Sequence, residues 1–228
     1  PDDIDRINDR SDGWNNICKE QSNIIMGLLE KLEPELKAKW LDLGCGSSKL
    51  LNIIKKYTPK KYLGTDIDPV RILKAVKRIE SNKDFSYYSE VVLSDLSKKW
   101  EDYEIAWSEF AKDKFNYIVC NFSLVHFYNE EFWLKIQEYS ANGTKFIFNL
   151  VNDNINSKWE DNGCYMLKSE NKVKYKFEIH NKEIEEQYLE SDFIKKKLLE
   201  NNWKLIEVYT HSGNSLSSKY SWYVAEYC

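Results

Sequence analysis

The feature that most constrains this chain is a short apolar segment that runs directly into two glycines. Residues 41–46 read Leu-Asp-Leu-Gly-Cys-Gly, the pattern of a buried strand followed by a tight turn. Glycine adopts the left-handed backbone region at little cost and lets the main chain approach a ligand closely. A dinucleotide-binding fingerprint would need a third glycine where this chain has Lys49. Alone, the segment predicts a strand followed by a turn. Two glycines at this spacing more often form a plain turn than a ligand-binding loop.

Strands and helices alternate along the first two thirds of the chain. Short apolar runs predict strands, and stretches with apolar residues at helical spacing predict helices. The strands are expected at residues 40–43, 62–65, 91–93, 117–120 and 145–150, and the helices at 21–37, from 49 onward, at 70–79 and at 130–139. This order predicts an α/β fold with a mostly parallel, twisted sheet and right-handed crossovers.

The last third of the chain changes character. An alternating segment at 172–178 predicts an edge-type strand, 192–201 a helix, and 205–210 and 222–226 two further strands. We expect this tail to add antiparallel strands to one edge of the sheet. No linker-like composition interrupts the sequence, so we expect one domain over residues 1–228. Because the chain does not begin with Met, we expect it to be excised from a longer polypeptide.

Composition excludes several classes of protein. The 228 residues contain no run of 18 apolar residues, and their formal net charge of −4 gives no general attraction for nucleic acid. The five cysteines form no CxxC pair and no Cys/His spacing typical of a metal site, so we expect no metal. Scattered cysteines in odd number are typical of reduced thiols in a cytosol-like compartment.

Two carboxylates follow later strands of the predicted sheet. Asp66 comes 24 residues after Asp42, at the end of the next strand, and Asp95 follows the third. A carboxylate in the position of Asp66 can accept hydrogen bonds from both ribose hydroxyls of an adenosyl group. Asp66 could instead simply cap the helix that begins near Pro69. Asp95 is placed to meet an adenine amino group, or it is an ordinary turn aspartate.

Several segments resemble known methyltransferase motifs. Asp42, Gly44 and Gly46, with no third glycine, resemble motif I of class I methyltransferases. Six short pieces further resemble, in order, the motifs of mRNA cap guanine-N7 methyltransferases, above all those of large cytoplasmic DNA viruses. They are 14–19 (WNNICK), 63–70 (LGTDIDPV), 94–97 (SDLS), 121–127 (NFSLVHF), 174–177 with 187–189 (KYKF and QYL), and 220–225 (YSWYVA).

This resemblance implies a Rossmann-like class I fold that binds S-adenosylmethionine. Lys19 would pair with the carboxylate of the methionine moiety, although a lone lysine near a helix start is usually just solvated. The other residues that the resemblance places at the cofactor are Asn15, Asp42, Gly44, Gly46, Asp66, Ile67, Asp95, Leu96, Asn121 and Phe122. The chain would be an enzyme of mRNA capping, located in the host cytoplasm or the virion.

The resemblance also implies a site for the cap guanine. It would be lined by Trp14, His126, Phe127, Glu186, Gln187 and Tyr220, since a purine face favours aromatic platforms and its edge favours polar groups. The aromatic residues could equally be half-buried core residues. The family has Glu before Tyr-Leu where this chain has Gln187, and a shift of one residue would give the role to Glu186. Between Phe122 and His126 this chain also has one residue more than the family's motif.

Guanine N7 carries a lone pair and no proton, so its methylation needs no general base. The three histidines (126, 180 and 211) form no triad-like pattern, and we expect catalysis by positioning alone. The expected partners are the capped 5′ end of RNA and, in a longer polypeptide, triphosphatase and guanylyltransferase domains, with no membrane. Two alternatives stay open: a methyltransferase for another acceptor, and a non-catalytic subunit of the same fold.

Overall fold

The computed structural model describes residues 12–98, 109–153, 158–161, 164–169, 172–177, 182–212 and 216–228. Its centre is a seven-stranded sheet in the order β10-β11-β5-β4-β1-β2-β3. The strands are β1 (Lys39–Leu43), β2 (Lys61–Asp66), β3 (Ser89–Leu93), β4 (Phe115–Cys120), β5 (Ser140–Val151), β10 (Trp203–Thr210) and β11 (Tyr220–Tyr227). β1 to β5 pair in parallel, whereas β11 runs antiparallel to both β5 and β10. The predicted fold class is confirmed.

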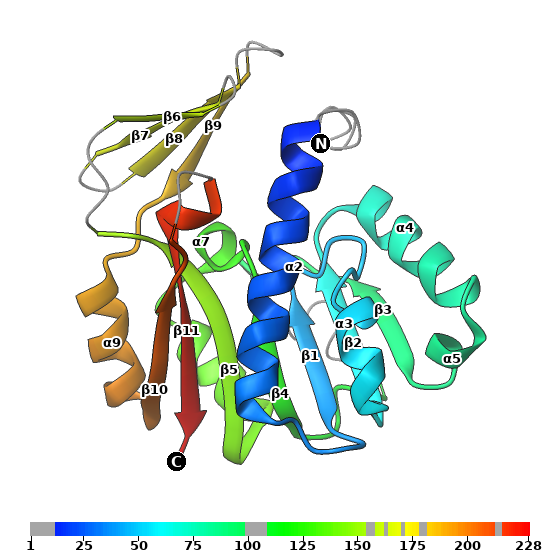
Figure 1. Cartoon of the computed structure of the whole chain (residues 1–228). Coiled ribbons are helices and arrows are strands. Elements are labelled where there is room, and N and C mark those ends of the chain that lie inside the picture. The colour runs from blue at the N-terminus through cyan, green and yellow to red at the C-terminus, as the bar shows by residue number, and fades with distance from the viewer. Residues whose placement is uncertain are drawn as a thin grey trace.

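Helices lie on both faces of this sheet (Figure 1). They are α2 (Asp12–Leu32), α3 (Leu51–Ile54), α4 (Pro69–Glu80), α5 (Lys83–Ser86), α7 (Leu124–Phe127), α8 (Phe132–Glu138) and α9 (Ser191–Glu200), with 3-10 turns η1 (Lys55–Tyr57) and η4 (Leu216–Lys219). One apolar cluster joins α2 and α3 to one face, and a second joins α8 and α9 to the other. Parallel strands covered on both sides are apolar along their whole length, which explains the uniformly apolar runs in the sequence.

Helix boundaries differ from the sequence-based prediction at two places. The helix predicted within 21–37, with a loop near Pro34, begins earlier than expected, at Asp12; it ends at Leu32, where Glu33 adopts a left-handed φ of 46° just before Pro34. The helix predicted from residue 49 is one α turn and one 3-10 turn, ended by Thr58 at φ 46°. Among the described residues, no helix has both the length and the apolar character needed to cross a lipid bilayer.

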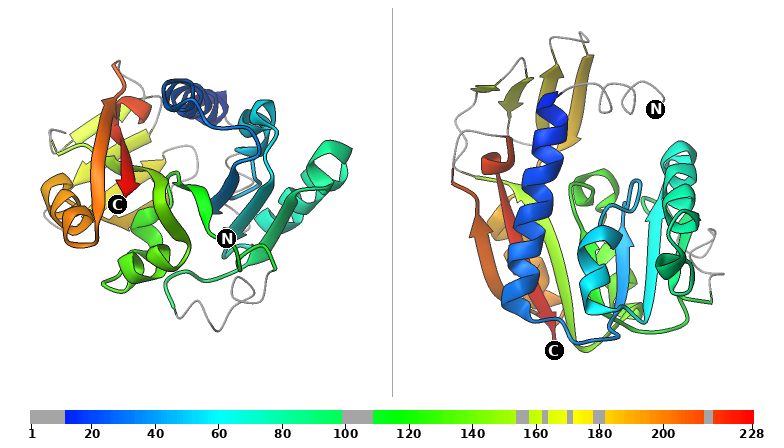
Figure 2. Two further views of the ribbon diagram at one scale, coloured as in Figure 1. Left: turned by 90° about the horizontal axis from the view of Figure 1, so that it is seen from below. Right: turned by 45° about the vertical axis from the view of Figure 1, so that its right-hand side comes forward.

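A second sheet packs against the first without pairing with it. It has four antiparallel strands, β6 (Lys158–Asp161), β7 (Cys164–Lys168), β8 (Lys172–Phe177) and β9 (Lys182–Gln187). The strand predicted at 172–178 is therefore real, but its expected place at the edge of the main sheet is wrong: β8 pairs with β7 and β9. Figures 1 and 2 show this second sheet at the end of the molecule toward which the parallel strands point.

Candidate functional site

The two glycines form a turn that is tied to the neighbouring strand. Gly44 and Gly46 have φ of 69° and 54°, in the left-handed region that favours glycine. Between them, the Cys45 amide donates to the Thr65 carbonyl at 2.7 Å. A Cβ added to Gly44 would lie 2.4 Å from the Cβ of Ser123, whereas one added to Gly46 would have no neighbour within 4 Å. Packing thus requires glycine at 44, and Gly46 leaves open space beside the turn.

Asp66 links this turn to the start of the next helix. One carboxylate oxygen accepts from the Gly46 amide at 2.8 Å, and the other from the Asp68 amide at 2.9 Å. The helix cap is Asp68, whose Oδ1 accepts from the Val70 amide at 2.8 Å. The structure therefore rejects the simple capping role for Asp66. Each Asp66 oxygen keeps a second lone pair for a ligand hydroxyl.

Asp42 is buried below the turn and has a partner within the protein. Its Oδ2 accepts from the Tyr62 hydroxyl at 2.7 Å. Burial raises the pKa of Asp42 to about 7; the Tyr62 hydrogen bond opposes this rise and the charge of Asp66 adds to it. Burial also raises the pKa of the Cys45 thiol well above its usual value. That Asp42 also serves the cofactor stays a prediction.

Asp95 closes a turn after β3. It accepts from the Ser97 amide at 3.1 Å and from the Ser97 hydroxyl at 2.5 Å, and it pairs with Lys98 at 3.2 Å. Partial burial acts to raise the pKa of Asp95, but these hydrogen bonds hold it below its usual value. This is the geometry of a turn aspartate. Of the neighbouring predicted residues, Leu96 is buried in the core and Ile67 is exposed.

The segment after β4 packs directly on the glycine turn. The Ser123 hydroxyl donates to the Leu43 carbonyl at 2.7 Å. Phe122 adopts φ of 59°, a strained value for a bulky residue, and its amide donates to Asn149 Oδ1 at 2.6 Å. Asn121 Oδ1 accepts from the Trp222 indole at 3.2 Å. Asn121 and Phe122 are thus held in place beside Ser123, which packs on the turn; that they contact the cofactor stays a prediction.

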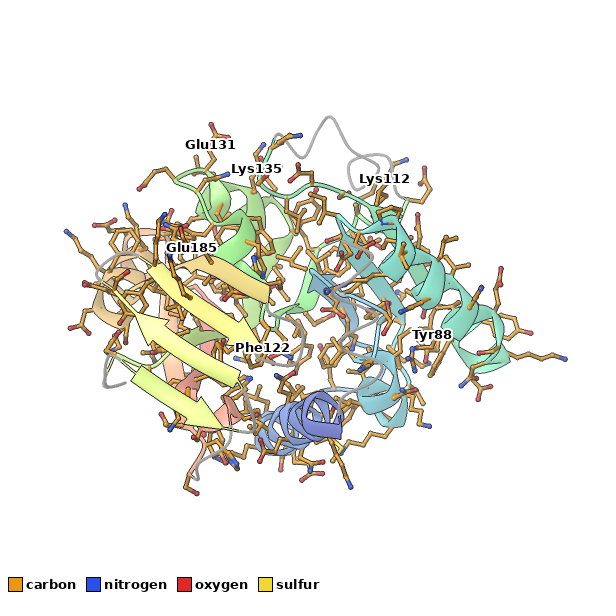
Figure 3. All side chains as sticks on the ribbon, turned by 90° about the horizontal axis from the view of Figure 1, so that it is seen from above. Tyr88, Lys112, Phe122, Glu131, Lys135 and Glu185 are labelled. Carbon is orange, nitrogen blue, oxygen red and sulfur yellow. The ribbon has the colours of Figure 1, made fainter. Side chains whose placement is uncertain are left out.

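A small hollow of about 10 Å³, partly open to solvent, adjoins this segment. We call it the aromatic pocket; it is lined by Phe122, Ser123, Leu124, Val125, Asn149, Leu150, Val151, Glu186 and Tyr220. The Phe122 and Tyr220 rings lie with their centroids 4.4 Å apart. Viewed from above, Phe122 lies near the middle of the molecule, next to the second sheet (Figure 3). Three residues predicted from separate motifs therefore meet here: Phe122, Glu186 and Tyr220.

Glu186, and not Gln187, faces this pocket. In β9, Glu186 pairs with Val173, which is fully buried, and its own side chain is 17% exposed. Side chains alternate along a strand, so Gln187 and Glu185 point away. Glu185 pairs with Lys172 and, at 3.2 Å, with Lys174.

His126 stands at the edge of the same pocket. Its Nε2 is 3.4 Å from Glu186 Oε1, and half of its side chain is exposed. Loss of solvent around the ring and then the charge of Arg71 lower the pKa of His126, against the opposing effect of Asp66. The imidazole is therefore neutral at neutral pH.

The remaining predicted residues lie elsewhere or are described less fully. Phe127 is 8% exposed and packs against Phe132, much as Tyr220, at 6%, packs against Phe122; that Phe127 lines the cap site stays a prediction. Lys19 is exposed on α2. Trp14 and Asn15 lie near the start of the same helix, where the described structure is limited to the backbone.

Sequence reasoning missed Asn149, which is 3% exposed on β5 and lines the aromatic pocket. A signal was present, because Asn149 is the single polar residue in the apolar run 146–151 (FIFNLV). Buried strand positions rarely hold an amide without a specific partner. In the described part of the chain, no group of three or more His, Cys, Asp or Glu side chains is arranged to hold a metal ion.

Comparison with known proteins gives a consistent result. A family model described as "Methyltransferase domain" matches residues 19–208. No curated protein sequence is significantly similar. Among solved structures, the chain is similar to an S-adenosylmethionine-dependent methyltransferase from Clostridium acetobutylicum ATCC 824 (15% identity over 97% of this chain and 94% of that one, TM-score 0.63).

Two further solved structures share the fold. One is a glycopeptide N-methyltransferase in complex with sinefungin, with 15% identity, coverage of 96% and 95%, and a TM-score of 0.66. The other is the magnesium protoporphyrin IX methyltransferase of Synechocystis PCC 6803 with bound S-adenosylmethionine, with 13% identity, coverage of 96% and 85%, and a TM-score of 0.61.

Proposed function

Because the chain belongs to the methyltransferase domain family, we propose that it transfers a methyl group from S-adenosylmethionine to N7 of the guanine that caps RNA. The observation that carries the proposal is the aromatic pocket. It brings two aromatic rings, Phe122 and Tyr220, together with the Glu186 carboxylate, directly beside the glycine turn.

The residues around the turn fit the cofactor. Gly46 leaves open space where a side chain would otherwise stand, so a ligand can approach the main chain there. Asp66 lies at the end of β2 and can accept hydrogen bonds from ribose hydroxyls. When bound, S-adenosylmethionine supplies a methyl group on a positively charged sulfur.

The chemistry of the residues that line the aromatic pocket suits a guanine. Stacking on an aromatic ring contributes about 1–3 kcal/mol per base and is open to any base. Selection comes from the edge, where a carboxylate such as Glu186 can accept from the guanine N1–H and N2 amino groups. A pyrimidine or adenine presents no such pair of donors. The proposal therefore assigns base selection to Glu186 and general affinity to the two rings.

Catalysis then follows from positioning. The nucleophilic lone pair of N7 carries no proton, so no residue has to remove one. Glu186 and the rings orient the base. The neutral His126 lies with its Nε2 3.4 Å from Glu186 Oε1. The Ser123 hydroxyl bonds the Leu43 carbonyl and so holds the pocket against the glycine turn. Holding two reactants in line can supply roughly 7–11 kcal/mol of the barrier reduction. The partners proposed are the capped RNA end and the other capping domains of a longer polypeptide, in the cytoplasm.

The test is methyl transfer to GpppA-capped RNA, with the product digested and the methylated position mapped. We expect 7-methylguanosine. Glu186→Gln should lower kcat/KM at least about tenfold, the value of one charge-assisted hydrogen bond. Glu185→Gln is the matched control, because it changes the neighbouring carboxylate that faces away and should leave kcat/KM unchanged.

Other outcomes would select the alternatives. Methylation of a small molecule or protein instead of the cap would make the chain a methyltransferase for another acceptor. Absence of any binding of S-adenosylhomocysteine in calorimetric titration would indicate a non-catalytic subunit. If Glu186→Gln and Glu185→Gln lost activity equally, the proposal that the aromatic pocket binds the guanine would be wrong.

A further inference from the structure

The side-chain amide of Asn149 has one polar atom with a hydrogen-bond partner and one without. Its Oδ1 accepts from the Phe122 amide at 2.6 Å. Its Nδ2 is buried and has no hydrogen-bond partner among the described residues. Turning the amide over would set two N–H donors against each other, so the orientation is fixed. The residue as a whole is 3% exposed.

A buried amide donor without a partner is costly, and proteins rarely keep one without a use. Asn149 lines the aromatic pocket together with Phe122, Glu186 and Tyr220. It lies on β5 opposite Trp222, on the face of the strand that carries Ile147 and Val151. The unsatisfied donor is therefore part of the wall of the site that the proposed function uses.

We infer that Asn149 is a specificity residue whose Nδ2 donates to O6 of the acceptor guanine. This inference rests on the proposed function and adds to it. The edge of guanine presents the O6 acceptor beside the N1–H and N2 donors, whereas adenine presents an amino donor in place of O6. Glu186 supplies the acceptor for the guanine donors, and Asn149 supplies the complementary donor.

The hydrogen bond from the Phe122 amide to Asn149 also explains the left-handed backbone conformation of Phe122. Phe122 holds φ of 59°, and the Asn149 side chain bonds its amide in that conformation. One residue thus fixes the ring that stacks on the base and reads the group at position 6. A substitution must separate these two roles, and Asn149→Asp does so because it keeps an acceptor for the Phe122 amide and removes the donor.

The test compares two acceptors, a GpppA cap and a cap in which 6-thioguanosine replaces guanosine. The thio analogue keeps N1–H and the N2 amino group but presents sulfur, a weaker acceptor, at position 6. We expect the unaltered protein to prefer GpppA about threefold to tenfold in kcat/KM. In Asn149→Asp, kcat/KM for GpppA should fall at least about tenfold and the preference should collapse to about one.

Asn116→Asp is the matched control. Asn116 lies on the neighbouring strand β4, outside the pocket, and both of its amide atoms are bonded, to the Lys39 amide and to Glu35. This variant should keep both kcat/KM and the preference. Should Asn149→Asp unfold, as a thermal transition would reveal, Asn149→Ala is measured in its place and judged by the preference alone, because it also removes the acceptor of the Phe122 amide and should lower kcat/KM for both caps.

Several results would overturn the inference. A preference that survives in the Asn149 variants would mean that the residue only supports Phe122. An unaltered protein that does not distinguish the two caps would exclude a donor at O6. If the protein transferred no methyl group to GpppA, both the proposed function and this inference would be wrong. The first two results would contradict this inference alone and leave the proposed function standing.

Discussion

The two halves of the site are built in different ways. The cofactor half comes from one stretch of chain, β1 to the start of α4, and its contacts are mostly main-chain: the Gly46 and Asp68 amides on Asp66. The aromatic pocket collects side chains from four distant places, namely Phe122, Asn149, Glu186 and Tyr220. A site made of backbone is dictated by local sequence, whereas one made of distant side chains can change its specificity without changing the fold.

The largest effect is expected from Gly44→Ala, which breaks the cofactor half. A Cβ would lie 2.4 Å from Ser123 Cβ and would force a left-handed φ on alanine. The two costs together should lower the free energy of unfolding by roughly 2–5 kcal/mol. Urea denaturation measures it. Gly46→Ala is the control: it carries only the backbone cost, so an equal loss in both variants would contradict the packing argument.

The next effect concerns the buried acid of the same half. With a pKa of about 7 when folded and its ordinary lower value when unfolded, Asp42 is protonated in the folded state alone at intermediate pH. Its contribution to stability is therefore fully present at low pH and is lost as pH rises through about 7. Asp42→Asn removes this loss. The difference in free energy of unfolding between Asp42→Asn and the unaltered protein should therefore grow by on the order of 3 kcal/mol from pH 5 to pH 8. If this difference stayed constant, Asp42 would not be a buried acid with a raised pKa.

A smaller effect would sharpen the role of the aromatic pocket. Phe122→Ala and Phe122→Gly both delete the ring, and each should weaken cap binding by about 1–3 kcal/mol. Only glycine accepts φ of 59° without strain, so Phe122→Gly should be more stable than Phe122→Ala by about 1 kcal/mol. Cap titration and thermal unfolding measure the two quantities. Greater stability of the alanine variant would mean that the strain is absent.

The smallest effect is that of pH on methyl transfer. The pKa of His126 is lowered, and N7 methylation needs no base, so kcat should be flat from about pH 7 to pH 8.5. A stopped assay over this range is sufficient. An inflection that disappears in His126→Ala would show that a proton is transferred after all.

Much of the cofactor half could be predicted from the sequence. Parallel strands end at one edge of a sheet, so the order strand, glycine turn, helix, strand and acid was enough to bring Gly44, Gly46 and Asp66 together. The roles of Asp42 and Asp95 were less accessible, because their partners Tyr62 and Ser97 follow from packing and turn geometry.

The aromatic pocket was harder to predict. The second sheet was missed because its strands are short and alternate in polarity, so nothing in residues 158–187 fixed how they pair. Only the β8–β9 register decides that Glu186 faces inward and Gln187 outward. The role of Phe127 could not be decided from the sequence, because aromatic character alone does not separate a core residue from a binding residue.

The central claim, that the two halves bind two different ligands, is tested most directly by calorimetric titration of S-adenosylhomocysteine and of GpppA into the unaltered protein, Asp66→Ala and Glu186→Gln. We predict that Asp66→Ala loses affinity for S-adenosylhomocysteine and keeps affinity for GpppA, while Glu186→Gln shows the reverse. If either substitution weakened both ligands equally in a folded protein, the division of the site into these two halves would be wrong.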